Sequence, residues 1–333
     1  MSLAARPGQA GGLPAHSFDK RGSSMRRREL LLASLALLAI PWRAAAAAQP
    51  AVTMVLKSLK NPFFELMTAG ARKHHAQHRA EYRLTLDGVP EESDVAGQVK
   101  IIETSIARRD QILIITPADS RAIIPALIKA IQSGMLVINL DNKLDDRALA
   151  GHGVNIPFVG PSNFNGARAV GDYVLRALKP RSKVGVIEGL PGSINAKARS
   201  DGYREAIANA GMSLAGIAWG DWERDKGRAA ATALLRQTPD LAALLCGNDN
   251  MAIGAAQALS ELKRDGKVLI GGYDNIPEMA ALLAAKRIYA TADQHPALQA
   301  EQAIRLGLES FNKRLTQSEM QSIVRTPVDL VKS

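Results

Sequence analysis

The chain has 333 residues, of which 47% are hydrophobic and 22% are charged, and it carries a formal net charge of +10. This composition is typical of a folded globular protein and excludes a wholly disordered chain and a collagen-like fibre. Cys246 is the single cysteine, so an internal disulfide and a zinc site built on two or more thiolates are excluded as well.

Residues 1–48 have the features of an export leader. Met25 is followed by three arginines at 26–28, an apolar run over 30–40 and small residues up to Ala48. A basic segment, an apolar segment too short to span a bilayer and an alanine-rich cleavage site together make a secretory signal peptide. We therefore predict a leader over 1–48 with the true start at Met25, and a periplasmic protein exported by the Sec route or, given the arginine pair, by the twin-arginine route.

From Val52 onward, short apolar runs alternate with longer amphipathic stretches. The first series predicts strands over 52–57, 82–87, 111–116 and 136–141, with helices over 63–79, 94–109 and 120–133. The second series predicts strands over 183–188, 214–219, 241–246, 267–273 and 288–293, with helices over 164–178, 197–210, 226–237, 250–264 and 277–286. A helix over 296–313 and an extended segment over 322–331 follow, and could complete either series. This alternation predicts an α/β fold with two doubly wound parallel-sheet lobes.

Polar and aromatic side chains follow the predicted strands, where ligands of open parallel sheets bind. These strand-end segments lie at 57–64, 116–120, 141–143, 188–189, 222, 247–249, 273–275 and 294. Planar amides and carboxylates bond adjacent hydroxyls, and an aromatic face packs against the C–H face of a sugar ring. The pattern therefore indicates a polyhydroxylated ligand. A Rossmann dinucleotide enzyme is excluded, because the segment 57–64 lacks the G-x-G-x-x-G loop.

Five motifs carry a family resemblance. They are Lys-Ser-Leu-x-Asn-Pro-Phe-Phe at 57–64, Ile-Asn-Leu-Asp at 138–141, Asp-Trp-Glu-Arg at 221–224, Asn-Asp-x-Met-Ala-Ile-Gly-Ala-Ala at 248–256 and Gly-Tyr-Asp-Asn-Ile-Pro-Glu at 272–278. In this order and spacing they resemble the periplasmic sugar-binding proteins of the ribose/allose group, with the closest likeness to its D-allose-binding members. The resemblance runs from about residue 51 to the end of the chain.

The resemblance implies a type I periplasmic binding protein, in which a three-strand hinge joins the two lobes. It places the crossovers near 161–163, 294–296 and 326–328. The N-terminal lobe would then hold 49–161 and 295–326, and the C-terminal lobe 163–293 and 328–333. Such a protein binds one monosaccharide between its lobes and delivers it to an ABC permease of the inner membrane, as a monomer without a cofactor or metal.

The resemblance also implies a set of ligand-binding side chains. They are Lys57, Asn61, Phe63, Phe64, Asp141, Lys197, Arg199, Trp222, Asn248, Asp274 and Gln294. The aromatic members would present ring faces to the sugar, and the amides and carboxylates would bond its oxygens. Lysines near the ligand would favour an anion, but Asp141 and Asp274 would repel one. We therefore predict a neutral sugar, D-allose or a related hexose or pentose.

Nearby residues are given structural roles. We expect Asp249 to cap the helix that begins near Met251, because aspartate is a favoured N-cap. Tyr273 is interpreted as packing, Lys60 as a solvated charge on the rim and Cys246 as a small buried side chain. His74 and His78 have helical i, i+4 spacing, but we predict no metal site because a third ligand is not evident.

Three alternatives remain. The ligand could be a sugar acid, a polyol or a sugar phosphate. A LacI-type sugar-responsive regulator has the same two-lobed core, but it needs a helix-turn-helix of about 60 residues where this chain has its leader. An enzyme is the third, and the strand ends hold neither a Ser/His/Asp nor a Cys/His set. We predict no enzyme activity and no nucleic-acid partner.

Overall fold

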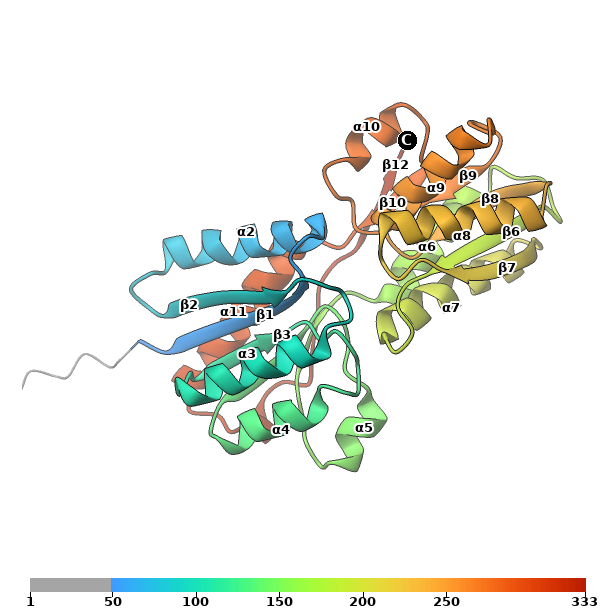
Figure 1. Ribbon diagram of the computed structural model, residues 1–333. Coiled ribbons are helices and arrows are strands. Elements are labelled where there is room, and N and C mark those ends of the chain that lie inside the picture. Colours follow the sequence, from blue (N-terminus) through green and yellow to red (C-terminus); the bar gives the residue numbers. More distant parts are fainter. Residues whose placement is uncertain (1–48) are drawn as a thin grey trace, which may run out of the picture. The chain divides into compact units, whose positions relative to one another are not determined.

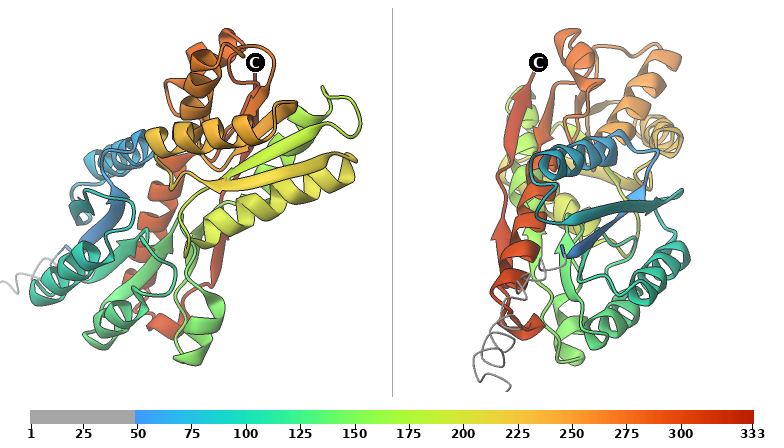
Figure 2. Two further views of the ribbon diagram at one scale, coloured as in Figure 1. Left: turned by 45° about the vertical axis from the view of Figure 1, so that its right-hand side comes forward. Right: turned by 90° about the vertical axis from the view of Figure 1, so that its left-hand side faces the viewer.

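A computed structural model gives the structure of the protein, and it describes residues 49–333. The predicted leader at 1–48 and the start at Met25 lie outside these residues. The described chain forms two parallel-sheet α/β lobes with helices on both faces of each sheet (Figures 1 and 2), which confirms the predicted fold class. Within this part of the chain, the structure has no helix that is both long and apolar enough to span a membrane.

The first sheet contains six parallel strands. From edge to edge its order is β11 (Ile323–Arg325), β5 (Phe158–Gly160), β4 (Leu136–Leu140), β3 (Ile112–Ile115), β1 (Ala51–Ser58) and β2 (Arg83–Val89). The strands β1, β3 and β4 are buried at every position, as expected for central strands covered on both faces. One face is covered by α2 (Pro62–Gln77) and α11 (Pro296–Asn312), and the other by α3 (Val95–Ala107) and α4 (Ile124–Gln132).

Alternate side chains of β1 fill two different layers of the core. Met54 packs in the layer under α2 and α11, and its neighbour Val55 packs in the layer under α3 and α4. This alternation follows from the period of two in a strand, and it explains why the strand needs apolar residues at consecutive positions.

The second sheet also has six strands. Its order is β12 (Asp329–Lys332), β10 (Ala290–Asp293), β9 (Leu269–Gly271), β8 (Leu241–Cys246), β6 (Lys183–Glu188) and β7 (Ser213–Trp219). Its two faces are covered by α6 (Asn163–Leu175) with α7 (Ile194–Asn209), and by α8 (Arg224–Gln237) with α9 (Asp249–Glu261). The short helices α5 (Asp146–Gly151) and α10 (Met279–Ala284) follow β4 and β9.

The chain passes between the sheets three times: between β5 and α6, between β10 and α11, and between β11 and β12 (Figure 1). These passages fall at the positions predicted for the crossovers, although the lobe boundaries themselves stay a prediction. The strand β12 pairs antiparallel with β10, while the other pairs are parallel. The strand β11 runs toward the second lobe and β12 continues in the same direction. It therefore runs antiparallel to the other strands of the second sheet, whose carboxyl ends point back toward the first lobe.

The predicted helices and strands are confirmed, with ends that differ by at most four residues, and the extended segment predicted over 322–331 forms two strands, β11 and β12, one in each sheet. Two short elements between β4 and α6, the helix α5 and the strand β5, were not predicted. The helix predicted over 197–210 begins at Ile194 instead, because the hydroxyl of Ser193 accepts a hydrogen bond from the backbone N–H of Ala196 and caps it. The strand predicted over 267–273 is confined to 269–271.

Candidate functional site

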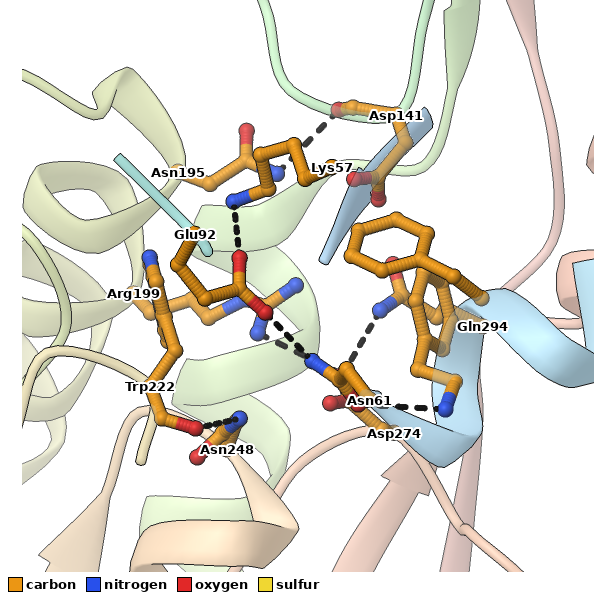
Figure 3. Close-up of a pocket in the computed structure, with 12 residues that line it drawn as sticks. Lys57, Asn61, Glu92, Asp141, Asn195, Arg199, Trp222, Asn248, Asp274 and Gln294 are labelled. Atoms are coloured by element: carbon orange, nitrogen blue, oxygen red, sulfur yellow. Dashed lines mark hydrogen bonds and ion pairs between the residues drawn. The ribbon is translucent and has the colours of Figure 1, made fainter. Parts of the chain in front are cut away.

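A pocket lies between the two lobes, beyond the carboxyl ends of strands from both sheets (Figure 3). Its lining residues are Lys57, Asn61, Phe63, Phe64, Glu92, Asp141, Asn195, Arg199, Trp222, Asn248, Asp274 and Gln294. They come from both lobes, and they are mostly buried polar groups and aromatic rings. The free volume between them is about 20 Å³, little more than the roughly 10 to 15 Å³ that one water molecule needs.

Ten of the eleven predicted site residues line this pocket, and Lys197 does not. The side chain of Lys197 is 74% exposed and forms an ion pair with Asp201 on the same helix. Arg199, which does line the pocket, is two positions further along α7, so its side chain points about 200° away around the helix axis. The placement predicted for Lys197 is therefore wrong.

The pocket also contains Glu92 and Asn195, which the sequence analysis missed. Glu92 lies three residues beyond the end of β2, at the edge of the sheet where the other strand ends carry pocket residues. Asn195 lies in the first turn of α7, which begins at Ile194, three residues before the start predicted at 197. The rule that ligands bind beyond strand ends would have indicated Glu92 if it had been applied to every strand.

A buried ion pair occupies the side of the pocket that belongs to the first lobe. The Nζ of Lys57 lies 3.0 Å from Oε2 of Glu92, and both side chains are only 6% exposed. The Nδ2 of Asn61 donates to Oε1 of Glu92 at 2.9 Å (Figure 3). The Oδ1 of Asn61 accepts from the backbone N–H of Phe63 and caps α2. These bonds fix the orientation of both the ammonium and the amide.

Arg199 is the buried cation of the second lobe. Its guanidinium carbon lies 3.8 Å from the ring centroid of Tyr273 and 5.3 Å from that of Trp222. Its Nε donates to Oδ1 of Asn163 at 2.7 Å, and its Nη1 donates to the carbonyl of Gly247 at 2.7 Å. A guanidinium held between two rings and bonded to fixed acceptors has one orientation, which suits it to direct its remaining N–H groups at a ligand.

Two further polar residues are joined at the hinge side of the pocket. The Nε2 of Gln294 donates to Oδ1 of Asp274 at 2.7 Å, and the same oxygen lies 3.4 Å from Nη1 of Arg199. Burial raises the pKa of Asp274 well above its ordinary value, and the guanidinium of Arg199 opposes this shift. Asp274 therefore connects the second crossover to the buried cation.

Asp141 is the least satisfied charged group among the lining residues. Its Oδ1 is buried and has no hydrogen-bond partner among the described residues. Burial raises the pKa of Asp141 from 3.8 to about 6, against the opposing effect of Arg199 and Lys57. A buried acceptor without a hydrogen bond costs free energy in the folded protein. This oxygen is therefore suited to accept a hydrogen bond from a hydroxyl group of a ligand.

Aromatic rings from both lobes border the pocket. The rings of Phe63 and Phe64 meet edge to face with centroids 5.2 Å apart. The Nζ of Lys57 lies 5.8 Å from the Phe64 centroid and 5.5 Å from the Trp222 centroid. The backbone of Trp222 has a left-handed φ of 71°, and Asn248 donates to its carbonyl at 3.1 Å. The backbone that carries the Trp222 ring is therefore fixed in an unusual conformation by this bond.

The helix α9 begins differently from the prediction. Asn248, not Asp249, is its N-cap, because Oδ1 of Asn248 accepts from the backbone N–H of Met251 at 3.0 Å. Asp249 is buried and instead accepts hydrogen bonds from the hydroxyl of Thr291 and the backbone N–H of Ile276. It therefore ties β10 and the loop after β9 to the start of α9.

The remaining residues that were given structural roles lie at the edge of the pocket or outside it. Tyr273 is fully buried, as predicted, and the face of its ring supports Arg199. Lys60 is exposed at the rim and pairs with Glu91. Cys246 is buried at the end of β8. His74 accepts or donates a hydrogen bond with the hydroxyl of Tyr82, and residues 49–333 contain no group of three residues suited to hold a metal.

The two lobes touch beside the pocket. Nδ2 of Asn195 donates to the carbonyl of Asp141 at 3.1 Å, and the hydroxyl of Ser193 donates to Oδ1 of Asn142 at 2.9 Å. A groove of about 480 Å³ adjoins the pocket, and Asn61, Glu92 and Trp222 line both spaces. The pocket is therefore closed by contacts between the lobes on one side and is continuous with a groove on another.

Known proteins resemble this chain over most of its length. Residues 52–313 match the family described as the periplasmic binding protein domain. The D-ribose/D-allose-binding protein of Pseudomonas aeruginosa is 40% identical over 283 residues, which are 85% of this chain and 89% of that protein.

Two solved structures are similar in fold as well as in sequence. One is an ABC transporter solute-binding protein from Burkholderia multivorans, which contains an unknown ligand that is represented as α-D-erythrofuranose. Its TM-score is 0.84 and its sequence is 42% identical, and the match covers 86% of this chain and 100% of that one. The other is an ABC transporter periplasmic solute-binding protein from Actinobacillus succinogenes 130z with bound D-allose, with a TM-score of 0.80, 30% identity and coverage of 85% and 98%. The chain therefore belongs to the periplasmic binding protein family.

Proposed function

We propose that this chain is the periplasmic substrate-binding component of an ABC sugar importer and that it binds one neutral monosaccharide between its two lobes. D-allose and D-ribose are the first candidates, because a relative that is 40% identical is named for both sugars and a similar solved structure contains D-allose. The residues predicted from the sequence, other than Lys197, are the proposed binding side chains, with Asn195 added to them, while Glu92 holds Lys57 and Asn61 in place.

The observation that carries this proposal is the composition of the pocket. Rings from both lobes, Phe64 and Trp222, lie within 6 Å of the same lysine ammonium. Buried amides and carboxylates, such as Gln294 and Asp141, lie in the same pocket. Sugars require this combination, because their C–H faces pack on rings while their hydroxyls need bonding partners once water is excluded.

The free volume of the pocket bears on how a sugar binds. At about 20 Å³ it is smaller than a monosaccharide, which is several times larger than a water molecule. Entry of a sugar must therefore separate the lobes or move the lining side chains, and the lobes close again over the bound sugar. We infer hinges near 161–163, 294–296 and 326–328, with the lobes divided at the boundaries predicted from the sequence.

The proposal includes the partners and the route of the protein. We infer that the chain is exported through its leader, acts as a monomer, passes its sugar unchanged to a permease in the inner membrane and uses no cofactor. The family is one of transport proteins, and the lining residues hold no nucleophile paired with a general base, which supports binding without turnover.

A thermal-shift panel tests the proposed function. A ligand that binds only the native state raises the melting temperature, so D-allose, D-ribose, other neutral sugars, polyols, sugar acids and sugar phosphates would be compared at equal concentration. We expect a rise with at least one neutral monosaccharide and recovery of that sugar chemically unchanged after incubation. A response confined to sugar acids or phosphates, or conversion of the sugar to a product, would contradict the proposal.

A further inference from the structure

We propose that Glu92 sets the charge selectivity of the pocket: it neutralises and positions Lys57, so that the pocket accepts neutral sugars and rejects anionic ones. This inference rests on the proposed function and assigns a specific role within it. Glu92 acts through Lys57 and Asn61, so it is a positioning residue.

The geometry around Glu92 supports this role. One carboxylate oxygen lies 3.0 Å from the Lys57 ammonium, and the other accepts from the Asn61 amide at 2.9 Å. A buried ammonium without a counterion would be strongly unfavourable, and it would attract any anion small enough to reach it. Because Glu92 already supplies the counterion, a carboxylate or phosphate on the sugar would have to compete with it.

The charges of the whole pocket lead to the same conclusion. The lining residues include the two cations Lys57 and Arg199 and the three carboxylates Glu92, Asp141 and Asp274. Arg199 lies 3.4 Å from Asp274, so both cations have a carboxylate nearby and Asp141 is the one in excess. Without the charge of Glu92, cations and carboxylates would be equal in number and Lys57 would lack its close counterion.

The neighbouring residue provides a matched control. Glu91 also forms an ion pair with a lysine, at 2.8 Å from Lys60, but those side chains are 60% and 72% exposed. Exposed pairs are screened by water and salt, so the charge of Glu91 acts weakly on a ligand in the pocket. The variants Glu91→Gln and Glu92→Gln therefore make the same chemical change at adjacent positions, one on the rim and one in the pocket.

The experiment measures affinities for neutral and anionic sugars of the same skeleton. Calorimetric titrations would compare D-allose with D-alluronate and D-ribose with D-ribose 5-phosphate, for the wild type, Glu91→Gln, Glu92→Gln and Glu92→Asp. In Glu92→Gln we expect the ratio of affinities to shift toward the anion by on the order of tenfold or more, because a nearby buried charge is removed. Glu91→Gln and the charge-preserving Glu92→Asp should keep the wild-type ratio.

A double variant keeps the test decisive if Glu92→Gln does not fold. Lys57→Met with Glu92→Gln removes both charges of the pair, which leaves the excess of one carboxylate unchanged, so discrimination against the anion should return to the wild-type level. An unchanged affinity ratio in a folded Glu92→Gln, or a shift of the ratio toward the anion in the double variant, would overturn the role proposed for Glu92. The proposed function would stand in either case. Failure of the wild type to bind any neutral sugar of the thermal-shift panel would overturn the proposed function, and the inference with it.

Discussion

Asp141 combines a cost to stability with a proposed benefit to binding. Its pKa is about 6 in the folded protein against 3.8 ordinarily, so its ionised form is disfavoured by burial. Between these two values the folded state binds more protons than the unfolded state, and the free energy of unfolding therefore falls as the pH rises through this window. A shift of about two pKa units corresponds to roughly 3 kcal/mol lost at neutral pH.

The substitution Asp141→Asn tests this conflict. Above about pH 6 the variant should be more stable than the wild type by on the order of 2 to 3 kcal/mol, and the difference should vanish as the pH falls toward 4. Its affinity for the sugar should nevertheless fall, because a charged acceptor is lost. Melting curves from pH 4 to 8 measure the first effect, and calorimetry at pH 7.5 the second.

Asp146→Asn is the control for this prediction, because its carboxylate is exposed on α5 and outside the pocket. Equal melting temperatures for the Asp141 variant and the wild type throughout the pH range would show that burial does not disfavour the charge. We also expect the affinity of the wild type to weaken as the pH drops through about 6, since protonated Asp141 is a weaker acceptor.

Two tryptophans near the end of β7 allow the stacking surface to be tested. Trp222 is 5% exposed and lines the pocket, while Trp219 is 63% exposed and donates its ring N–H to Glu188. Trp222→Ala should weaken sugar binding by about 1 to 3 kcal/mol through lost apolar contact, with the fold retained. Trp219→Ala should leave the affinity unchanged. Equal affinities for both variants by calorimetry would remove Trp222 from the proposed site.

At the scale of elements, strand ends and unusual backbone conformations coincide. Three pocket residues that are not glycine have a left-handed or otherwise positive φ: Asp141 at 60°, Trp222 at 71° and Asp274 at 122°. Each follows a strand and turns its side chain toward the pocket (Figure 3). Positive φ is costly for such residues and is retained where the surroundings determine it, so the loops are built for side-chain placement.

The loop after β6 supports one of these residues closely. A methyl group on Gly189 would lie 2.1 to 2.3 Å from ring atoms of Trp222, which cannot occur without moving the ring. Gly189→Ala should therefore displace Trp222 and lower sugar affinity by about fivefold, which corresponds to the low end of the Trp222→Ala effect. Gly151→Ala is the control, because nothing lies within 4 Å of the added carbon there. Tryptophan fluorescence and calorimetry would record the result, and identical affinities in both variants would contradict it.

The sequence predicts elements well where burial alone defines them. The strands β6 and β8 match their predicted bounds, because each is a short apolar run covered on both faces. Elements of few residues, such as β5 and α5, give too short a pattern to recognise. The direction of β12 could not be predicted either, since it depends on the path of the chain through the crossover and not on local residues.

Residues that line the pocket were predictable where the strand-end rule and the family motifs coincide, as for Asn61 and Gln294. The error at Lys197 came from helix phase, which places neighbouring residues on different faces. Pairings such as Lys57 with Glu92 join segments 35 residues apart and depend on tertiary packing, so no local pattern indicates them.

At the scale of the whole described chain, the lobes meet on one side of the pocket and leave a groove on the other. Ser120, Asn142 and Ser193 are among the residues in contact across the lobes. The groove of about 480 Å³ contains Asn61 of one lobe and Asn250 of the other, whose amide donates to Asn61 at 3.3 Å. A sugar that bonds both lobes favours the conformation in which they are closest, and thus shifts the population toward closure.

Small-angle scattering during a sugar titration tests this account most directly, because it measures closure and stoichiometry together. The purified protein would be titrated with the neutral sugar that most raises its melting temperature, beginning with D-allose and D-ribose. We expect the radius of gyration to decrease and to level off at one sugar per chain. A radius that stays the same at saturation, or that continues to change beyond one equivalent, would contradict the binding of one monosaccharide between two closing lobes.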